Sequence, residues 1–211
     1  MDTNMDKASA RRRATEAVRR RYDRTAGFFD LLEHSRRLRK WRALLWQKAE
    51  GTRILEVGVG TGASFRHYPP GSEVTAIDIS DKMLSRARAR ARRTGLNVTL
   101  EKMDVQQLRF ADNSFDTVVA SLVLCSVPDP TLGLSEIKRV CRAGGKVVLL
   151  EHVLSRHRIP AFFMGLLNPV ARLAGDNINR RTIENVAQSG LVVEKVTHLN
   201  DLFKLIEARK V

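Results

Sequence analysis

Beyond Gly51, short runs of apolar residues alternate with longer segments in which apolar residues recur at helical spacing. The runs show little polar alternation, which is typical of parallel strands buried on both faces. We expect strands at 53–58, 73–78, 97–103, 114–121, 145–151, 191–197 and 202–208. Helices are expected near 61–68, 81–94, 131–142 and 180–189. This alternation predicts a doubly wound α/β sheet of seven strands, with the last two strands forming an antiparallel hairpin at one edge.

A different pattern precedes this domain. Over 22–46, a helical stripe is interleaved with Arg and Lys and contains Phe28, Leu31, Leu32, Ser35, Leu38, Trp41 and Leu45. Basic helices with such a face are typical of membrane-surface anchors, although a helix packed on a core has the same stripe. We therefore expect 1–48 to be a basic amphipathic helical lid that docks on a membrane. The α/β domain would then cover 49–211, and its strandless segment 152–190 would cap the carboxyl ends of the strands.

The charge distribution adds a partner to this picture. The 211-residue chain has 37 Lys and Arg against 23 Asp and Glu, a net charge of +14. Residues 1–48 hold 14 basic and 6 acidic residues, residues 82–93 hold six basic residues and no acid, and the remainder balances. Because the excess is concentrated in two places, it predicts a polyanionic partner: anionic lipid head groups or nucleic acid.

Other features exclude several classes of protein. Cys125 and Cys141 make no disulfide framework, and no Cys/His cluster has metal-ligand spacing, so we expect no metal and a reduced, cytoplasmic setting. The start of the chain is Arg-rich without the apolar core of a signal peptide. The apolar tract 159–174 is too short to span a bilayer and is interrupted by polar residues and prolines. We expect a protein that is not integral to a membrane, and the sequence favours no oligomeric state.

A glycine-rich turn is the strongest chemical signal. The sequence E-V-G-V-G-T-G at 56–62 follows an expected strand, and its glycines would let the backbone approach a ligand closely. Asp78 ends the next strand, 20 residues after Gly58, the spacing of a carboxylate that binds ribose hydroxyls. With Ala63 the turn also satisfies a loose dinucleotide pattern, so these residues alone leave NAD(P) open.

Two further acids distinguish between cofactors. Glu56, two residues before the first glycine, suits a cationic amino-acid group, and Asp104 after the third strand suits an adenine amino group. Together with A-I-D-I-S at 76–80, M-D-V at 103–105 and F-A-D-N-S-F-D at 110–116, the glycine turn resembles the class I S-adenosylmethionine-dependent methyltransferases. This resemblance covers about residues 50–210. The segment at 139–145 also resembles that family, with Ala143 where proline is usual.

The resemblance implies a Rossmann-like sheet of order 3-2-1-4-5-7-6 with an antiparallel last strand, and S-adenosyl-L-methionine as cofactor. The positions that it implies for cofactor binding are Tyr22, Glu56, Gly58, Gly60, Thr61, Gly62, Asp78, Ile79, Met83, Met103, Asp104, Val105, Ser121, Leu122 and Ser126.

A narrower resemblance concerns the substrate. The segments 21–30, 150–153 and 175–182 resemble the small bacterial phosphatidylethanolamine N-methyltransferases, and the first also resembles quinone-ring C-methyltransferases. An amine acceptor must lose a proton before its lone pair can attack a methyl group. We expect Tyr22, Glu151 and His152 to be catalytic, and Asn177, Arg180 and Arg181 to bind the substrate. The two arginines could hold its phosphate bidentately.

The predicted function is therefore stepwise N-methylation of phosphatidylethanolamine toward phosphatidylcholine. The enzyme would be peripheral, docked on the anionic inner face of the cytoplasmic membrane, with no nucleic-acid partner. The alternatives are a quinone-precursor C-methyltransferase, an RNA methyltransferase, or a non-catalytic nucleic-acid-binding protein. A dehydrogenase is disfavoured by the two acids described above.

Overall fold

The computed structural model describes residues 2–32, 35–152 and 182–211. Within these residues a seven-stranded sheet has the order β3-β2-β1-β4-β5-β7-β6. Neighbouring strands from β3 to β5 are parallel, whereas β7 is antiparallel to both β5 and β6. The strand order and edge hairpin expected from the sequence are thus confirmed. The strands are β1 Arg53–Val57, β2 Glu73–Asp78, β3 Thr99–Lys102, β4 Phe115–Ser121, β5 Cys141–His152, β6 Val192–His198 and β7 Phe203–Arg209.

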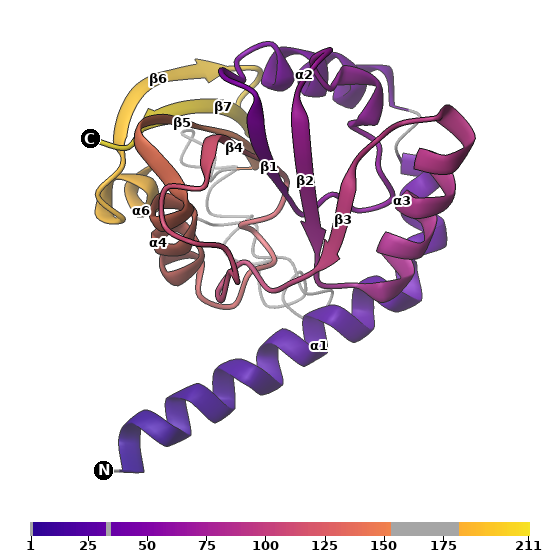
Figure 1. Ribbon diagram of the computed structural model, residues 1–211. Helices are drawn as coiled ribbons and strands as arrows, with labels where there is room; N and C mark the ends of the chain where they lie inside the picture. The colour runs from indigo at the N-terminus through magenta and orange to yellow at the C-terminus, as the bar shows by residue number, and fades with distance from the viewer. Residues whose placement is uncertain (1, 33–34, 153–181) are drawn as a thin grey trace.

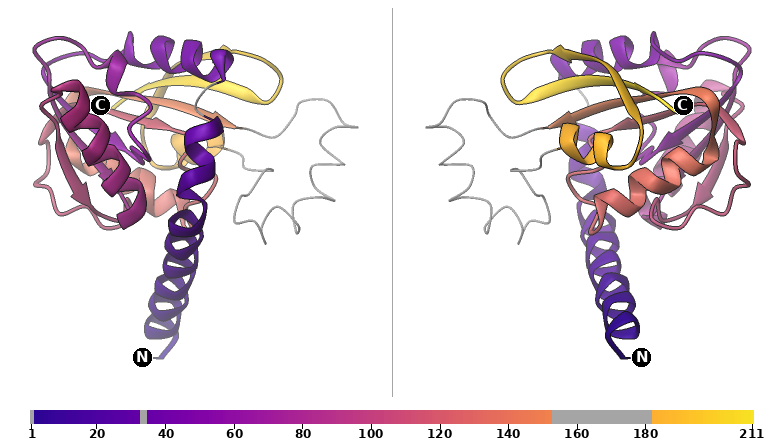
Figure 2. Two further views of the ribbon diagram at one scale, coloured as in Figure 1. Left: turned by 90° about the vertical axis from the view of Figure 1, so that its right-hand side faces the viewer. Right: turned by 90° about the vertical axis from the view of Figure 1, so that its left-hand side faces the viewer.

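Helices cover both faces of this sheet (Figures 1 and 2). They are α1 Asp2–Leu32, α2 Arg36–Trp46, α3 Asp81–Thr94, α4 Pro130–Val140 and α6 Thr182–Gln188, with a 3₁₀ turn, η1, at Phe65–His67. On one face, Leu45 and Trp46 of α2 pack against β1, β4 and β5. On the other, Ile137 of α4 and Val186 of α6 pack against the same strands. Successive residues of a strand point to opposite faces, so each central strand is buried on both sides.

Helix α3 shows how a very basic segment becomes a stable helix. The Ser80 hydroxyl accepts a hydrogen bond from Met83 N at 3.1 Å, and Gly95 ends the helix in a left-handed conformation with φ 63°. Its apolar side chains face the sheet and are buried: Met83, Leu84, Ala87 and Ala91. The arginines between them therefore point mainly toward solvent.

The expected helix at 61–68 is wrong. Turns occupy this stretch, followed by the short η1. Gly62 has φ +83°, and a Cβ there would lie 2.5 Å from the Phe65 ring, so the chain turns too tightly for an α-helix. Pro69 and Pro70 then prevent a helix from continuing.

The N-terminal stripe is divided between two helices with different environments. Helix α2 begins at Ser35, whose hydroxyl accepts from Leu38 N at 3.5 Å, and it buries Leu45 and Trp46 on the sheet. That half of the stripe is core packing rather than an exposed anchor. Helix α1 instead contacts α3 near its end, where Ala26 is buried, while its first half extends away from the domain (Figures 1 and 2). A lid function for 1–48 remains a prediction.

The segment expected to cap the strands is described only in part. Residues 153–181 lie outside the described residues. Helix α6, at the end of the expected cap, packs against α4 and β6 as part of the layer beneath the sheet. In the described ranges, no helix is both long enough and apolar enough to cross a membrane.

Candidate active site

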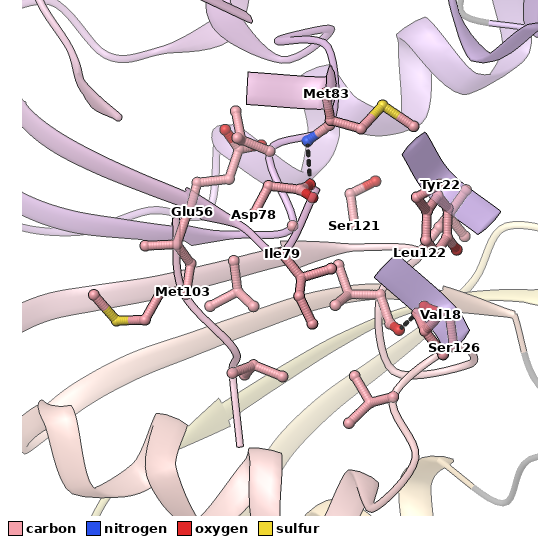
Figure 3. A pocket seen from close by; sticks show the side chains of 18 of the residues that line it. Val18, Tyr22, Glu56, Asp78, Ile79, Met83, Met103, Ser121, Leu122 and Ser126 are labelled. Carbon is pink, nitrogen blue, oxygen red and sulfur yellow. Dashed lines mark hydrogen bonds between the residues drawn. The ribbon is translucent and has the colours of Figure 1, made fainter. Parts of the chain in front are cut away.

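A pocket lies at the carboxyl ends of β1, β2 and β4, where the loops that follow these strands diverge. Helix α1 contributes Thr15, Val18 and Tyr22 to its lining, and α2 contributes Leu38 and Arg42. Figure 3 shows Val18 and Tyr22 on the side of the pocket that also holds Leu122 and Ser126. The pocket is thus built from the sheet edge and from the two N-terminal helices.

The structure brings nearly all of the expected cofactor residues together. All but Gly62 line this pocket: Tyr22, Glu56, Gly58, Gly60, Thr61, Asp78, Ile79, Met83, Met103, Asp104, Val105, Ser121, Leu122 and Ser126. Gly62 lies one step further along the turn, against Phe65.

The two leading glycines of the turn have different tasks. A Cβ on Gly58 would lie 2.4 Å from Val123, so this glycine lets the loop after β4 approach closely. A Cβ on Gly60 would meet no protein atom within 4 Å. Because Gly60 lines the pocket with open space above it, its backbone is available to a ligand.

Asp78 connects the turn to β2. One carboxylate oxygen accepts from Gly60 N at 2.9 Å and the other from Ser80 N at 2.8 Å. Burial raises the pKa of Asp78, and these backbone donors act against that rise. A carboxylate oxygen has two lone pairs, so each oxygen can accept another hydrogen bond from a ligand hydroxyl.

Glu56 is the most deeply buried acid of the pocket, with 2% of its surface exposed. Burial raises its pKa to about 7, while hydrogen bonds from the hydroxyls of Tyr68 and Ser64 lower it. The Tyr68 ring is fixed by Trp46, with ring centres 4.3 Å apart. The positive charge of Arg42, which lines the same pocket, also favours the ionised form of Glu56.

A hydrogen-bonded group ties α1 to the pocket wall at Asp104. The Thr15 hydroxyl donates to Asp104 Oδ2 at 3.3 Å and accepts from Gln106 Nε2 at 3.0 Å. Nearer the end of α1, Asp23 accepts from the Ser80 hydroxyl at 2.6 Å. Two polar contacts therefore hold α1 across the ends of β2 and β3.

The loop after β4 is held in an unusual conformation. Leu122 has φ 59°, which is strained for a bulky residue, and its N–H donates to Leu150 O at 2.8 Å. Oε1 of Glu151 accepts from Val123 N at 3.0 Å and from Leu124 N at 3.1 Å. These contacts maintain the strained turn.

The catalytic role expected for Glu151 stays a prediction. Its side chain is fully buried below this loop and does not line the pocket. In this position one carboxylate oxygen, Oε1, holds two backbone amides of the loop, which is a positioning contact.

Ser121, at the end of β4, is a further candidate for contact with a ligand. Its hydroxyl is buried, lines the pocket and has no hydrogen-bond partner within the described residues. Buried hydroxyls are normally paired, so this one is suited to a bound ligand.

The other expected catalytic and substrate residues are placed less directly. Tyr22 is half-buried, and the Arg21 guanidinium lies 5.0 Å from the centre of its ring. His152 lies outside the pocket lining, with its ring edge-on to Phe203 at 5.3 Å. Asn177, Arg180 and Arg181 lie outside the described residues.

The sequence reasoning missed several pocket residues. Thr15 and Val18 precede Tyr22 at helical spacing, and that spacing was the available signal. Arg42 carries no local signal, because only the packing of α2 brings it to the pocket. Tyr68 lies outside the lining, and the turn before Pro69 brings it to Glu56, to which its hydroxyl donates.

The chemistry of the pocket fits S-adenosyl-L-methionine. Asp78 suits two ribose hydroxyls, and Asp104 at the next strand end suits an adenine amino group. Glu56 and Arg42 present opposite charges, which match the ammonium and carboxylate of an amino acid. The buried Ser121 hydroxyl completes a lining with a polar partner for each part of the cofactor.

Comparisons with known proteins agree with this chemistry. The methyltransferase-domain family matches residues 55–149. The chain is 43% identical over 143 residues to phosphatidylethanolamine N-methyltransferase of Cereibacter sphaeroides, covering 65% of this chain and 68% of that protein. It is 37% identical over 153 residues to human thiol S-methyltransferase TMT1B, covering 67% and 62%. It is 39% identical over 115 residues to ubiquinone/menaquinone biosynthesis C-methyltransferase UbiE of Bdellovibrio bacteriovorus, covering 53% and 48%.

Solved structures give the same fold at low sequence identity. One is a geranyl diphosphate C-methyltransferase from Streptomyces coelicolor with S-adenosyl-L-homocysteine, at a TM-score of 0.68 and 18% identity, covering 83% of this chain and 80% of that one. The chain belongs to the S-adenosylmethionine-dependent methyltransferases, and S-adenosyl-L-methionine is its cofactor.

Proposed function

We propose that this enzyme transfers methyl groups to the amine of phosphatidylethanolamine, stepwise toward phosphatidylcholine. The observation that carries the proposal is the 43% identity over 143 residues to a phosphatidylethanolamine N-methyltransferase. The thiol S-methyltransferase is 37% identical over a similar length, so a thiol acceptor is the second candidate.

The pocket residues would position the cofactor for an in-line displacement. When bound, S-adenosyl-L-methionine supplies an electrophilic methyl group on a sulfonium sulfur. Glu56 and Arg42 would hold its amino-acid end, and Asp78 its ribose. Catalysis of such a transfer depends chiefly on alignment, so fixed side chains at both ends of the cofactor are the main requirement.

An amine acceptor imposes a second requirement. An alkylammonium group titrates near 10, so the site must favour its neutral form before methylation. Tyr22 lies in the pocket lining on α1 and is the candidate to receive this proton as the phenolate, which becomes the neutral phenol. Its ring also offers a face to a cationic amine. His152, at the end of β5, is the other candidate for the proton.

A lipid substrate would require the enzyme to reach a bilayer. The first half of α1 projects from the domain and exposes Arg11, Arg12 and Arg13 (Figure 2). Basic side chains near an anionic membrane contribute about 1 kcal/mol each to binding. We propose that α1 carries the enzyme to the anionic inner face of the cytoplasmic membrane as a peripheral protein.

The test is methyl transfer from radiolabelled S-adenosyl-L-methionine to vesicles of phosphatidylethanolamine and phosphatidylglycerol. Parallel reactions contain an alkyl thiol, a demethylated quinone and total RNA. We expect label in mono-, di- and trimethylated lipid, and none with the Asp78→Asn protein as the control for cofactor dependence. Label in the thiol, quinone or RNA but not in lipid would overturn the proposed substrate and leave the methyltransferase assignment intact.

A further inference from the structure

A second groove lies beside the cofactor pocket, between residues 9–20 of α1 and the end of β3. It is open, with a volume of about 850 Å³, and it shares Thr15, Ile79, Met103 and Asp104 with the cofactor pocket. In Figure 1, α1 passes the end of β3, and its N-terminal part extends away from the domain. Thr15 and Asp104, which join α1 to the end of β3, therefore line both the groove and the cofactor pocket.

Both walls of this groove are basic. Its cationic residues are Arg12, Arg13, Arg19 and Arg20 from α1, and Lys102 and Arg109 from the end of β3 and the loop beyond it. The acidic residues of the lining are Glu16 and Asp104. Glu16 already binds Arg19 at 2.5 Å and Arg20 at 3.3 Å. Asp104 is used by Thr15 and Gln106.

Three guanidinium groups remain without an acidic partner. Arg12 has no hydrogen-bond or ion-pair partner in the described part of the chain. Arg13 donates to the Ser9 hydroxyl at 2.9 Å, and Arg109 donates to the Lys102 carbonyl at 3.0 Å. These partners are neutral. Within the described residues Arg12, Arg13 and Arg109 thus have no acid to neutralise them, whereas Lys102 pairs with Asp81 at 2.5 Å and Arg19 with Asp23 at 2.8 Å.

We infer that this groove binds a phosphate group between the arginines of α1 and Arg109, and that the bound phosphate holds α1 over the cofactor pocket. Like charges on opposite walls push α1 away from β3. A phosphate with several acceptor oxygens removes this repulsion and bridges both walls, because guanidinium groups bind phosphate bidentately. The phosphate can be free or part of a lipid head group.

The inference links the groove to cofactor binding. Helix α1 supplies Thr15, Val18 and Tyr22 to the cofactor pocket, so an anion that stabilises the docked helix also stabilises that wall. Thermodynamic linkage requires the effect to be reciprocal: cofactor must raise phosphate affinity by the same factor as phosphate raises cofactor affinity. Typical couplings between sites correspond to factors of about 5 to 150.

The experiment measures binding of S-adenosyl-L-homocysteine to the full chain by calorimetry, without any methyl acceptor. Inorganic phosphate is compared with chloride at equal ionic strength, and phosphatidylglycerol vesicles with phosphatidylcholine vesicles. The test variant is Arg12→Gln/Arg109→Gln. The matched control is Arg66→Gln/Lys195→Gln, which removes the same charge from exposed positions on η1 and β6, outside α1 and α3.

We expect phosphate or phosphatidylglycerol to tighten S-adenosyl-L-homocysteine binding about fivefold or more in the wild type and in the control variant. The Arg12→Gln/Arg109→Gln protein should lose this gain and bind at least as tightly in chloride as the wild type does, because its groove walls no longer repel each other. A response to phosphate identifies a small ligand, and a response to phosphatidylglycerol vesicles alone identifies a lipid head group. Equal loss in both variants, or no response to either phosphate or phosphatidylglycerol, would overturn the inference.

Discussion

Glu56 illustrates how a single buried acid can make cofactor binding depend on pH. Burial raises its pKa to about 7, so near neutral pH a substantial fraction of the free enzyme carries a protonated Glu56. A cationic ammonium group bound beside it favours the carboxylate and draws the pKa down. Cofactor binding below pH 7 should therefore release a proton from the protein.

The first prediction concerns this proton. We expect the affinity for S-adenosyl-L-homocysteine to rise from pH 5.5 to about pH 7, near the pKa of Glu56, and then to level off. Glu56→Gln should bind more weakly above pH 7 and lose this dependence. Calorimetry in buffers of different ionisation enthalpy counts the proton directly. A pH profile that is the same in Glu56→Gln would contradict the assignment.

The same residue affects stability with a definite sign. Because the pKa of Glu56 is raised in the folded protein, the folded state binds more protons than the unfolded state between about pH 4.5 and about 7. The free energy of unfolding of the cofactor-free enzyme should therefore fall as pH rises through that window. The contribution is on the order of 3 kcal/mol, and Glu56→Gln should remove this part of the pH dependence.

Glu151 gives the second prediction. Glu151→Ala would leave two buried amides, Val123 N and Leu124 N, without their acceptor, which should lower the free energy of unfolding by about 1–3 kcal/mol. The loop at Leu122 would relax, and kcat should fall. Glu151→Gln keeps an oxygen in the same place and should recover most of both losses, as measured by chemical denaturation and methyl transfer. If Glu151 were instead the proton acceptor, the Gln and Ala variants would lose activity equally.

Sequence reasoning at this scale found the acids and glycines because each stands beside a strand end, where local pattern predicts ligand contact. It could not place Glu151, because strand alternation puts this side chain on the face opposite Glu56 and His152, and the pleat alone does not say which face lines the site. Arg42 could not be predicted as a pocket residue from the sequence, because only the packing of α2 on the sheet brings it near Glu56.

At the scale of elements, two glycines of the turn have different roles: Gly60 leaves space for a ligand, and Gly58 lets the loop after β4 pack closely. Gly58 and Gly60 both have positive φ, 69° and 56°, so alanine at either position is strained by about 1 kcal/mol. The two positions differ in what surrounds them. Alanine at 58 would collide with Val123, whereas alanine at 60 meets open pocket.

The third prediction follows from that contrast. Gly60→Ala should fold with a loss of about 1 kcal/mol in the free energy of unfolding but bind S-adenosyl-L-homocysteine at least tenfold more weakly. Gly58→Ala should be destabilised by several times as much, because the loop after β4 must move. Thermal unfolding with and without the ligand distinguishes the two effects. Unchanged ligand affinity in Gly60→Ala would show that this backbone does not face the cofactor.

Elements were predictable wherever burial alone decides them. The parallel strands are continuous apolar runs, and β1, β2 and α3 lie within one residue of their expected bounds. The start of β5 at Cys141 was missed because its first residues pair with Phe115 through an irregular register, which is a tertiary feature. The helix at 61–68 was wrong because the conformation of Gly62 and the following prolines outweigh apolar spacing.

For the whole molecule, the uneven distribution of charge is the dominant feature. The excess lies on three helices: α1 holds 8 basic and 5 acidic residues, α2 holds 5 basic and no acidic residues, and α3 holds 6 basic and 1 acidic residue. Because α1 and α3 contact each other, their basic surfaces are neighbours. The sequence predicted an amphipathic stripe for membrane contact, yet the α2 half of that stripe is buried on the sheet. The exposed arginines of α1 and α3 therefore carry the proposed attraction to an anionic surface.

The fourth prediction tests this surface as a unit. Arg88→Gln/Arg92→Gln on α3 and Arg11→Gln/Arg13→Gln on α1 each remove two exposed charges from opposite parts of the surface. At about 1 kcal/mol per residue, either pair should weaken sedimentation with phosphatidylglycerol vesicles by roughly 10–30-fold. The attraction should also fall steeply between 0.05 and 0.5 M salt, since screening shortens its range. Phosphatidylcholine vesicles should bind none of the proteins well. If only the α1 pair weakens binding, the membrane contact is confined to that helix and α3 faces away; if neither pair does, the charge of this protein serves a partner other than a membrane.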